Sequence, residues 1–215
     1  MREVIIFGNT QFSRLMGHYL SISNKFHLVG YTVDSEYITS CNEIPFENIE
    51  NFYSPQNYSI LLALGYNKMN MIREKKYHEI KAKGYEIVSY ISDNSNVLIP
   101  KESIPEGTIV LPGAFIEYNV KLGVSNIINQ NCVISHDCII GDFNFFAASS
   151  TLAGDIIVGN RSFFGCNSTY KNGIRIGDMC LVGAGAYVQK NLDSDSVVVP
   201  ERSILLEKNS LQVNI

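Results

Sequence analysis

A histidine and an aspartate lie side by side in a stretch of the chain that is otherwise apolar and regular. They are His136 and Asp137, within the sequence Ile-Ser-His-Asp-Cys-Ile-Ile-Gly-Asp of residues 134–142. An imidazole with a pKa of about 6.5 can take up a proton at neutral pH, and an adjacent carboxylate can hold its tautomer and stabilise the imidazolium. The pair therefore predicts a general base with a carboxylate partner, although an isolated pair of this kind is also typical of a solvated surface.

A period of six residues surrounds this pair and must position it. An apolar residue occupies every sixth position without interruption, a glycine often follows it, and a small side chain often stands two places before it. A fixed period of this kind indicates stacked units that bury a shared core only together. The apolar series is Leu98, Ile104, Val110, Ile116, Leu122, Ile128, Ile134, Ile140, Phe146, Leu152, Val158, Phe164, Tyr170, Ile176, Val182 and Val188.

The period predicts a parallel β-helix. Six residues form one extended run of about 20 Å, and glycine or small residues allow a corner after each run. Three runs close a triangle, so that residues 18 positions apart lie above one another at about 4.8 Å. The residues expected in one inward column are Ile116, Ile134, Leu152 and Tyr170. His136 stands two positions after Ile134 and should reach outward near a corner, whereas a stack without any chemistry would be a rigid spacer.

Before the repeat, strand-like and helix-like segments alternate. This alternation predicts an α/β N-terminal domain, a Rossmann-like parallel sheet, over residues 1–92. The repeat domain then spans residues 93–215, and its tail after Pro200 should cap the open end of the stack. The expected strands are residues 3–7, 28–33, 60–64 and 86–91, and the expected helices are residues 11–21 and 68–83.

Ligands of such sheets bind at the carboxyl ends of the strands. Gly8 would let the backbone approach a phosphate, and the helix that follows would present free N–H groups to it. Asp34 could accept a hydrogen bond from a ribose or from a uracil-type donor. Gly8 is all that remains of a glycine-rich fingerprint, so a simple turn glycine is the alternative. The candidate binding residues are Gly8, Asn9, Thr10, Asp34, Gly65 and Tyr66.

The composition of the chain argues against nucleic acid and membranes as partners. The net charge of −4 provides no basic field for nucleic acid or for an anionic membrane. The lysines and arginines of residues 68–83 are interleaved with Glu74 and Glu79, which is typical of a solvated helix face. The first apolar run is too short for a signal or membrane segment, so we expect a cytoplasmic protein without membrane insertion.

The spacing of the cysteines indicates reduced thiols and not a metal site. Five cysteines include no Cys-x-x-Cys pair, and Cys132, Cys138 and Cys180 fall at the small-residue position of the repeat. We expect them to be buried and reduced, and we expect no metal.

The combination of a Rossmann-like domain, a short polar join, a six-residue repeat and the Ser-His-Asp-Cys-x-Ile-Gly-Asp sequence resembles a known family. It is similar to the hexapeptide-repeat acyltransferases of the sialic-acid O-acetyltransferase and nucleotide-aminosugar N-acetyltransferase type, whose β-helices are left-handed. The resemblance covers nearly the whole chain. It implies transfer of acetyl from acetyl-CoA to the amine of a nucleotide-linked amino sugar in bacterial surface-glycan synthesis. It also implies that His136 is the general base, that Asp137 assists it, and that Asn129 contacts the substrate.

The same resemblance implies a homotrimer with acetyl-CoA between neighbouring prisms. The N-terminal domain of one subunit would hold the nucleotide. The sequence departs from the family at Phe145, where a second histidine that touches the acyl donor is usual, and at the turn of residues 8–13, where the glycine-rich sequence is absent. The aromatic residues near Phe145 could instead thicken the core and an interface. The residues expected to line the donor groove are Phe145, Gly154, Gly165, Gly183 and Ala184.

Two other functions remain open at the level of sequence. The same machinery could acetylate a sugar hydroxyl, as in sialic-acid O-acetylation. Alternatively, the first domain could bind a nucleotide-sugar while the repeat only assembles the oligomer, and the loss of the second histidine at Phe145 is compatible with such a non-catalytic module.

Overall fold

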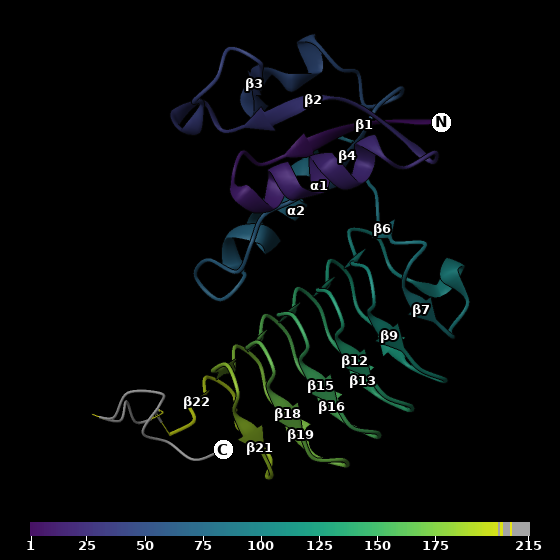
Figure 1. The fold of residues 1–215 in the computed structure, drawn as a ribbon. Coiled ribbons are helices and arrows are strands. Elements are labelled where there is room, and N and C mark those ends of the chain that lie inside the picture. The colour runs from purple at the N-terminus through teal and green to yellow at the C-terminus, as the bar shows by residue number, and fades with distance from the viewer. Residues whose placement is uncertain (202, 204–206, 208–215) are drawn as a thin grey trace.

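The computed structural model describes residues 1–201, 203 and 207, and it consists of an α/β domain and a stack of short coils (Figure 1). The predicted cap formed by the tail after Pro200 lies largely outside the described residues. Within the described part of the chain, no helix is long and apolar enough to cross a bilayer.

Five parallel strands form the sheet of the first domain, in the order β3-β2-β1-β4-β5. Val4 and Ile6 of β1 pack on the side of the first helix, and Ile5 and Phe7 pack on the side of the second. The helices therefore cover opposite faces of the sheet, as predicted for a Rossmann-like domain. The elements are β1 (Arg2–Phe7), α1 (Gln11–Ser21), β2 (Phe26–Val33), η1 (Ser35–Tyr37), β3 (Glu43–Pro45), η2 (Phe46–Asn51), β4 (Ser59–Leu62), α2 (Met71–Ala82) and β5 (Glu86–Ile87).

Two-residue strands then repeat and form the three faces of a prism. The β14 face has the strand order β22-β20-β17-β14-β11-β8-β6, the β12 face β21-β18-β15-β12-β9-β7, and the β13 face β10-β13-β16-β19. The predicted inward column is confirmed, because residues 116, 134, 152 and 170 are paired in register and buried. The elements are β6 (Tyr90–Ile91), β7 (Asn96–Val97), η3 (Lys101–Ser103), β8 (Ile109–Val110), β9 (Phe115–Ile116), β10 (Lys121–Leu122), β11 (Ile127–Ile128), β12 (Val133–Ile134), β13 (Ile139–Ile140), β14 (Phe145–Phe146), β15 (Thr151–Leu152), β16 (Ile157–Val158), β17 (Phe163–Phe164), β18 (Thr169–Tyr170), β19 (Arg175–Ile176), β20 (Leu181–Val182), β21 (Tyr187–Val188) and β22 (Val197–Val198).

The coils turn at residues in the left-handed backbone region, and these residues recur with the same period of six. The expectation that the glycines after the apolar positions form the corners is therefore wrong. Gly123 and Gly141 do not have a positive φ, but an added Cβ on either would lie within 2.7 Å of the backbone of the next coil, so they allow the coils to stack. The corner residues are Gly107, Gly113, Asn119, Ser125, Asn131, Asp137, Phe143, Ser149, Asp155, Arg161, Asn167, Gly173, Met179 and Gly185.

The first coil departs from the predicted register by one residue. β7 pairs Val97, and not Leu98, with Ile116. Leu98 is 59% exposed, so its prediction as a core residue was wrong, because η3 takes up one extra residue in this coil. The expected strand of residues 86–91 is in fact two strands, and the second, β6, already pairs with β8. The stack therefore begins at Tyr90 and not at residue 93.

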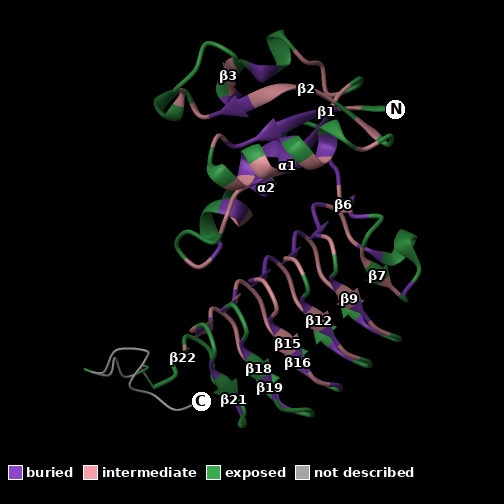
Figure 2. Cartoon of the chain, in the orientation of Figure 1, coloured by how far each residue is buried: buried purple, intermediate pink, exposed green. Residues whose placement is uncertain are grey.

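The α/β domain covers the β14 face of the prism. Ile109, Ile127 and Phe145 on this face share one apolar cluster with Met16 and Leu20 of α1. Figure 2 shows buried coil segments on the side of the prism that faces α1 and α2. The two domains therefore form one packed unit.

A buried asparagine and a buried arginine fasten α2 to the prism. Asn70 donates hydrogen bonds of 3.1 and 3.2 Å to the carbonyl groups of residues 161 and 162. Arg73 donates at 2.6 and 3.0 Å to those of residues 143 and 144. Complete burial lowers the pKa of Arg73 to about 9, so the guanidinium stays charged at neutral pH. Carbonyl and amide dipoles are its hydrogen-bond partners within the described residues.

Candidate active site

The corners of successive coils stack into three edges, each named here by one residue. The His136 edge joins the β12 and β13 faces, the Gly165 edge joins the β14 and β12 faces, and the Phe143 edge joins the β13 and β14 faces. Because the α/β domain covers the β14 face, the His136 edge lies opposite that domain. The His136 edge contains residues 117–119, 135–137 and 153–155, and the Gly165 edge contains residues 129–131, 147–149, 165–167 and 183–185.

His136 and Asp137 form a hydrogen-bonded pair on an open corner, as the sequence predicted. Nδ1 of His136 lies 2.9 Å from Oδ2 of Asp137, and the two side chains are 54% and 45% exposed. A carboxylate accepts only, so Nδ1 carries the hydrogen and Nε2 keeps its lone pair. The ring therefore keeps a basic nitrogen on the side away from the carboxylate.

Residues on the coil before it hold this pair from one side. Nδ2 of Asn119 donates to Oδ1 of Asp137 at 2.7 Å, which leaves Oδ2 for the imidazole. The backbone N–H of His136 donates to a carboxylate oxygen of Glu117 at 2.9 Å. Both contacts restrict the corner on which the imidazole stands.

A glycine on the following coil supports the imidazole from the other side. Gly154 is buried, and an added Cβ there would lie 2.4 Å from Cε1 and 2.6 Å from Nε2 of His136. Gly154 was expected to contact the acyl donor, and the structure places it against the ring of the base. A side chain at this position would displace the imidazole.

The charges around His136 favour its protonated form. The hydrogen bond with Asp137 raises the pKa of His136 above its ordinary value, and the carboxylates of Glu117 and Asp155 add to this effect. The hydrogen bond from Asn119, followed by that from His136, lowers the pKa of Asp137. The imidazole is therefore a stronger base than a free histidine, with an ionised partner beside it.

The Gly165 edge carries three of the five residues expected to line the donor groove, namely Gly165, Gly183 and Ala184. Gly183 and Ala184 lie one coil after Gly165, Ala184 is exposed, and an added Cβ at Gly185 would meet nothing within 4 Å. Asn129 lies on the same edge two coils before Gly165, and it donates to the carbonyl of Phe146 at 2.8 Å. The edge thus offers small residues and open backbone, which fit a thin, extended ligand.

The structure does not bring the two halves of the expected site together in one chain. Asn129 and the small residues of the Gly165 edge are separated from His136 by the whole β12 face. One side of the triangle is about 20 Å long. A site built from both edges therefore requires two chains.

The candidate nucleotide residues Gly8, Asn9, Thr10 and Asp34 line one cavity at the carboxyl ends of β1, β2 and β4, whereas the candidates Gly65 and Tyr66 do not line it. The cavity has a volume of about 490 Å³. Gly8 is buried with φ +129°, and an added Cβ would lie 2.9 Å from the carbonyl oxygen of Ala63. Only glycine fits this turn, which supports the alternative of a structural turn glycine. The cavity is lined by Phe7, Gly8, Asn9, Thr10, Val33, Asp34, Glu36, Tyr37, Ile38, Thr39, Leu64, Asn67, Ile72 and Lys76.

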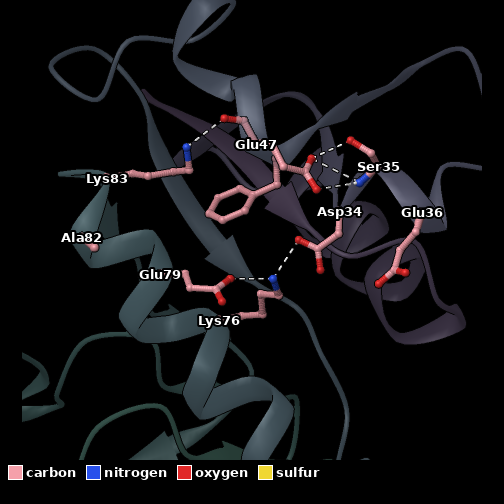
Figure 3. A pocket seen from close by; sticks show the side chains of 9 residues that line it. Asp34, Ser35, Glu36, Glu47, Lys76, Glu79, Ala82 and Lys83 are labelled. Carbon is pink, nitrogen blue, oxygen red and sulfur yellow. Dashed lines mark hydrogen bonds and ion pairs between the residues drawn. The ribbon is translucent and has the colours of Figure 1, made fainter.

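A lysine of α2 fixes the candidate carboxylate of this cavity. Nζ of Lys76 lies 2.7 Å from Oδ1 of Asp34 and 2.5 Å from Oε2 of Glu79, and Figure 3 shows the three side chains converging. Burial alone would lower the pKa of Lys76, but the hydrogen bonds with both carboxylates outweigh it and raise the pKa. Lys76 therefore stays charged, and it lies between this cavity and a neighbouring open one lined by Ser35 and Glu47.

Phe145 lies at the seam between the domains. It is 8% exposed and its ring contacts Tyr66 and Phe163, with centroids 5.0 and 5.6 Å away. The structure therefore corrects its expected place in an open donor groove and supports the alternative that it thickens an interface. Tyr66, expected to bind substrate, lies over this aromatic pair and is 51% exposed.

Three functional neighbours escaped the sequence analysis. Asn119 contacts Asp137 from 18 residues away, Lys76 contacts Asp34, and Arg73 joins the domains. The spacing of 18 residues is a usable signal for Asn119, whereas the interleaved charges of α2 predict only a solvated helix face. That prediction was wrong for Lys76 and Arg73, which are buried.

The cysteines divide into two groups. Cys132, Cys138 and Cys180 are buried free thiols, as predicted, and burial raises the pKa of Cys138 to about 11. Cys41 and Cys166 are exposed. Among the residues that the structure describes, no group of three or more His, Cys, Asp or Glu side chains could hold a metal ion.

Comparison with known proteins identifies the repeat. A family model described as the hexapeptide repeat of succinyl-transferase matches residues 155–190. The six-residue period is therefore a hexapeptide repeat, and the resemblance stated from the sequence is confirmed for this part of the chain.

Solved structures share the fold over nearly the whole chain. The acetyltransferase domain of PglB from Neisseria gonorrhoeae is 21% identical with a TM-score of 0.79, over 93% of this chain and 97% of that one. PerB from Caulobacter crescentus, solved with CoA and GDP-perosamine, is 24% identical with a TM-score of 0.80, over 92% and 94%. WeeI from Acinetobacter baumannii is 21% identical with a TM-score of 0.76, over 93% and 97%.

These similarities establish the class of fold. The chain combines a Rossmann-like α/β domain with a left-handed parallel β-helix, as predicted. The resemblance to hexapeptide-repeat acyltransferases is therefore confirmed in the repeat and in the fold.

Proposed function

We propose that the protein is an acetyl-CoA-dependent N-acetyltransferase that acts on the amine of a nucleotide-linked amino sugar. The observation that carries the proposal is the basic Nε2 of His136, whose Nδ1 is held by an ionised carboxylate on an open corner of the hexapeptide prism. The neighbouring fold of PerB, solved with CoA and GDP-perosamine, supports the donor and the substrate class.

The chemistry is direct transfer without a covalent enzyme intermediate. Nε2 of His136 takes a proton from the substrate amine as its nitrogen attacks the thioester carbonyl of acetyl-CoA. Backbone N–H groups stabilise the resulting oxyanion. The carbon–sulfur bond then breaks, the thiolate of coenzyme A leaves and takes the proton from His136, and the N-acetylated sugar is released. Asp137 stabilises the imidazolium between these steps.

The charges of the His136 edge favour an amine over a hydroxyl as acceptor. Glu117, Asp137 and Asp155 surround the base, and all three act electrostatically on its ring. A sugar amine reaches the site largely as an ammonium ion, which carboxylates attract, whereas a sugar hydroxyl is neutral. The ammonium ion loses one proton to solvent before its nitrogen attacks, and His136 takes the second.

We propose further that the site forms between subunits of a homotrimer. The His136 edge of one chain would face the Gly165 edge of the next, with acetyl-CoA between them and the nucleotide in the cavity around Asp34. Exposed apolar side chains on the uncovered faces, such as Ile139 and Ile157 of the β13 face and Tyr187 of the β12 face, support burial in an assembly. We place the reaction in the cytoplasm, in the synthesis of bacterial surface glycans.

The test is a panel of nucleotide-linked amino sugars with acetyl-CoA, in which a thiol reagent measures released coenzyme A. We expect turnover with at least one amino sugar and no turnover with its hydroxyl counterpart. His136→Gln should lower kcat by about 10²- to 10⁴-fold while the thermal melting temperature is kept. Turnover of the hydroxyl sugar alone would indicate an O-acetyltransferase, and binding without any released coenzyme A would indicate a non-catalytic module.

A further inference from the structure

We propose that Asn119 is a positioning residue for the base: its side-chain amide locks the Asp137 carboxylate in the orientation that orders the His136 imidazole. This inference rests on the proposed function for its effect on rate. Its structural content, however, is measurable without any substrate.

The geometry assigns the two oxygens of Asp137 to different partners. Oδ1 accepts from Nδ2 of Asn119 at 2.7 Å, and Oδ2 lies 2.9 Å from Nδ1 of His136. Asp137 is 45% exposed, so a carboxylate held on one side only would be free to rotate into solvent. The second hydrogen bond removes that freedom and keeps one oxygen on the ring.

The stacking of the coils makes this contact possible. Asn119 and Asp137 are equivalent corner residues on consecutive coils, with φ of +57° and +61°. Equivalent positions lie about 4.8 Å apart, which is the reach of one side-chain hydrogen bond between an amide and a carboxylate. If the coil of Asn119 were out of register with the coil of Asp137, the two side chains would no longer meet.

A conformational reason for asparagine at this corner has to be separated from the hydrogen bond. Asparagine tolerates the left-handed region better than most residues. Asn131 and Asn167 occupy similar corners on the Gly165 edge with φ of +57° and +54°, so the backbone alone accounts for the residue type there. At position 119 the same side chain also faces a carboxylate, and a glycine variant distinguishes the two roles because it keeps the backbone and removes the amide.

Three groups facing the imidazole set its charge. They are the carboxylates of Glu117 on the preceding coil, Asp137 on its own coil and Asp155 on the following coil. Asn119 itself is neutral. Its removal changes the imidazole through the position of Asp137 and leaves the net charge of the edge unchanged.

The first measurement is an NMR titration of the imidazole in the wild-type chain and in Asn119→Gly, without substrate. The His136→Gln spectrum assigns the resonance, and His18, His27 and His78 serve as internal controls in the same tube. We expect the titration midpoint of His136 to fall toward that of an ordinary histidine and the Nε2-protonated tautomer to become populated. The other three histidines should not move.

The second measurement is kinetic. We expect kcat of Asn119→Gly to fall about tenfold with KM for acetyl-CoA and for the sugar nucleotide unchanged, since outer-shell partners commonly contribute this much. Asn119→Asp retains the shape but replaces the donor with a second carboxylate. It should raise the titration midpoint of His136 and still lower kcat.

The outcomes separate this inference from the proposed function. An unchanged His136 midpoint and tautomer in Asn119→Gly overturns the positioning role, as does full activity of Asn119→Asp. If the His136 midpoint shifts in Asn119→Gly but the wild-type chain transfers no acetyl group, the positioning role is supported and the proposed enzymatic function is contradicted. A lowered kcat with an unmoved midpoint shows a merely structural effect and also overturns the inference.

Discussion

Asn129 and His136 are seven residues apart in the sequence, yet they lie on different edges of the prism with the whole β12 face between them. A reaction that uses both edges therefore needs the His136 edge of one chain and the Gly165 edge of a neighbouring chain. This relationship makes the assembly itself testable through subunit mixing.

Two variants that are each inactive should restore activity when they share a trimer. His136→Gln removes the base, and Ala184→Trp blocks the Gly165 edge at an exposed position. Random mixing in a co-expressed trimer pairs an intact His136 edge with an intact Gly165 edge at about a quarter of the seams. We expect about a quarter of wild-type coenzyme A release from the mixture. Activity no greater than that of the two parents alone would place both halves in one chain.

Asp137→Asn should move the acidic limb of the pH–rate profile to lower pH. The base acts when neutral, so wild-type activity is lost as pH falls through the pKa of His136, which Asp137 raises. Without the carboxylate this pKa falls, and the loss of activity then begins at lower pH. The plateau of kcat should fall as well, because the imidazolium loses its stabilising partner. A profile of kcat against pH between 5 and 9 measures both effects, and an unmoved limb contradicts the pairing.

Gly154→Ala should impair catalysis far more than stability. An added Cβ would lie 2.4 Å from the His136 ring, and the three nearest atoms it meets all belong to that ring. Gly154 does not have a positive φ, so the backbone accepts alanine. We expect kcat to fall about 100-fold through a displaced base and the free energy of unfolding to change by less than about 1 kcal/mol. A fully active variant would show that the ring can move without consequence.

Acetyl-CoA should protect Cys166 from alkylation. Cys166 is exposed beside Gly165 on the edge proposed to bind the donor, and Cys41 is exposed in the α/β domain. Maleimide labelling followed by peptide mass spectrometry should show slower modification of Cys166 with acetyl-CoA present. Cys41 is the internal control and should react at an unchanged rate. Equal rates at Cys166 with and without acetyl-CoA would place the donor elsewhere.

Arg73→Met should destabilise the whole chain. The fully buried guanidinium donates to carbonyl groups on two residues of the Phe143 edge, and its loss leaves those groups buried without this partner. We expect the free energy of unfolding in urea to fall by about 3 kcal/mol. Arg14→Met, at an exposed site, should change it by about 0.5 kcal/mol or less. Comparable losses in both variants would show that Arg73 does not fasten the domains.

The stack of coils was predictable because a buried column leaves a periodic trace in the sequence. The prediction failed at Leu98, where an apolar residue happened to fit the period although η3 had shifted the register by one. The left-handed corners also left a trace, since Asn119, Asn131 and Asp137 are separated by multiples of six residues. This spacing predicts the corners, whereas the glycines that follow the apolar positions, such as Gly123 and Gly141, do not.

The candidate site was only partly predictable. The pairing of His136 with Asp137 follows from their adjacency, because neighbouring side chains at a corner can meet. The contact from Asn119 depends on which residue of each coil forms the corner, which the apolar period does not specify. The burial of Phe145 depends on how the two domains dock, and neither segment contains that information alone.

The fastening of Asn70 and Arg73 to the Phe143 edge also limits how this architecture can vary in length. The α/β domain enters the stack at Tyr90 and is tied again to the coils at Phe143 and Arg161, so the distance between these points is set by a rigid body. An additional coil between them would move the receiving carbonyls by about 4.8 Å and break the attachment. Repeats can therefore be gained or lost during evolution only beyond the second tie, at the C-terminal end of the solenoid.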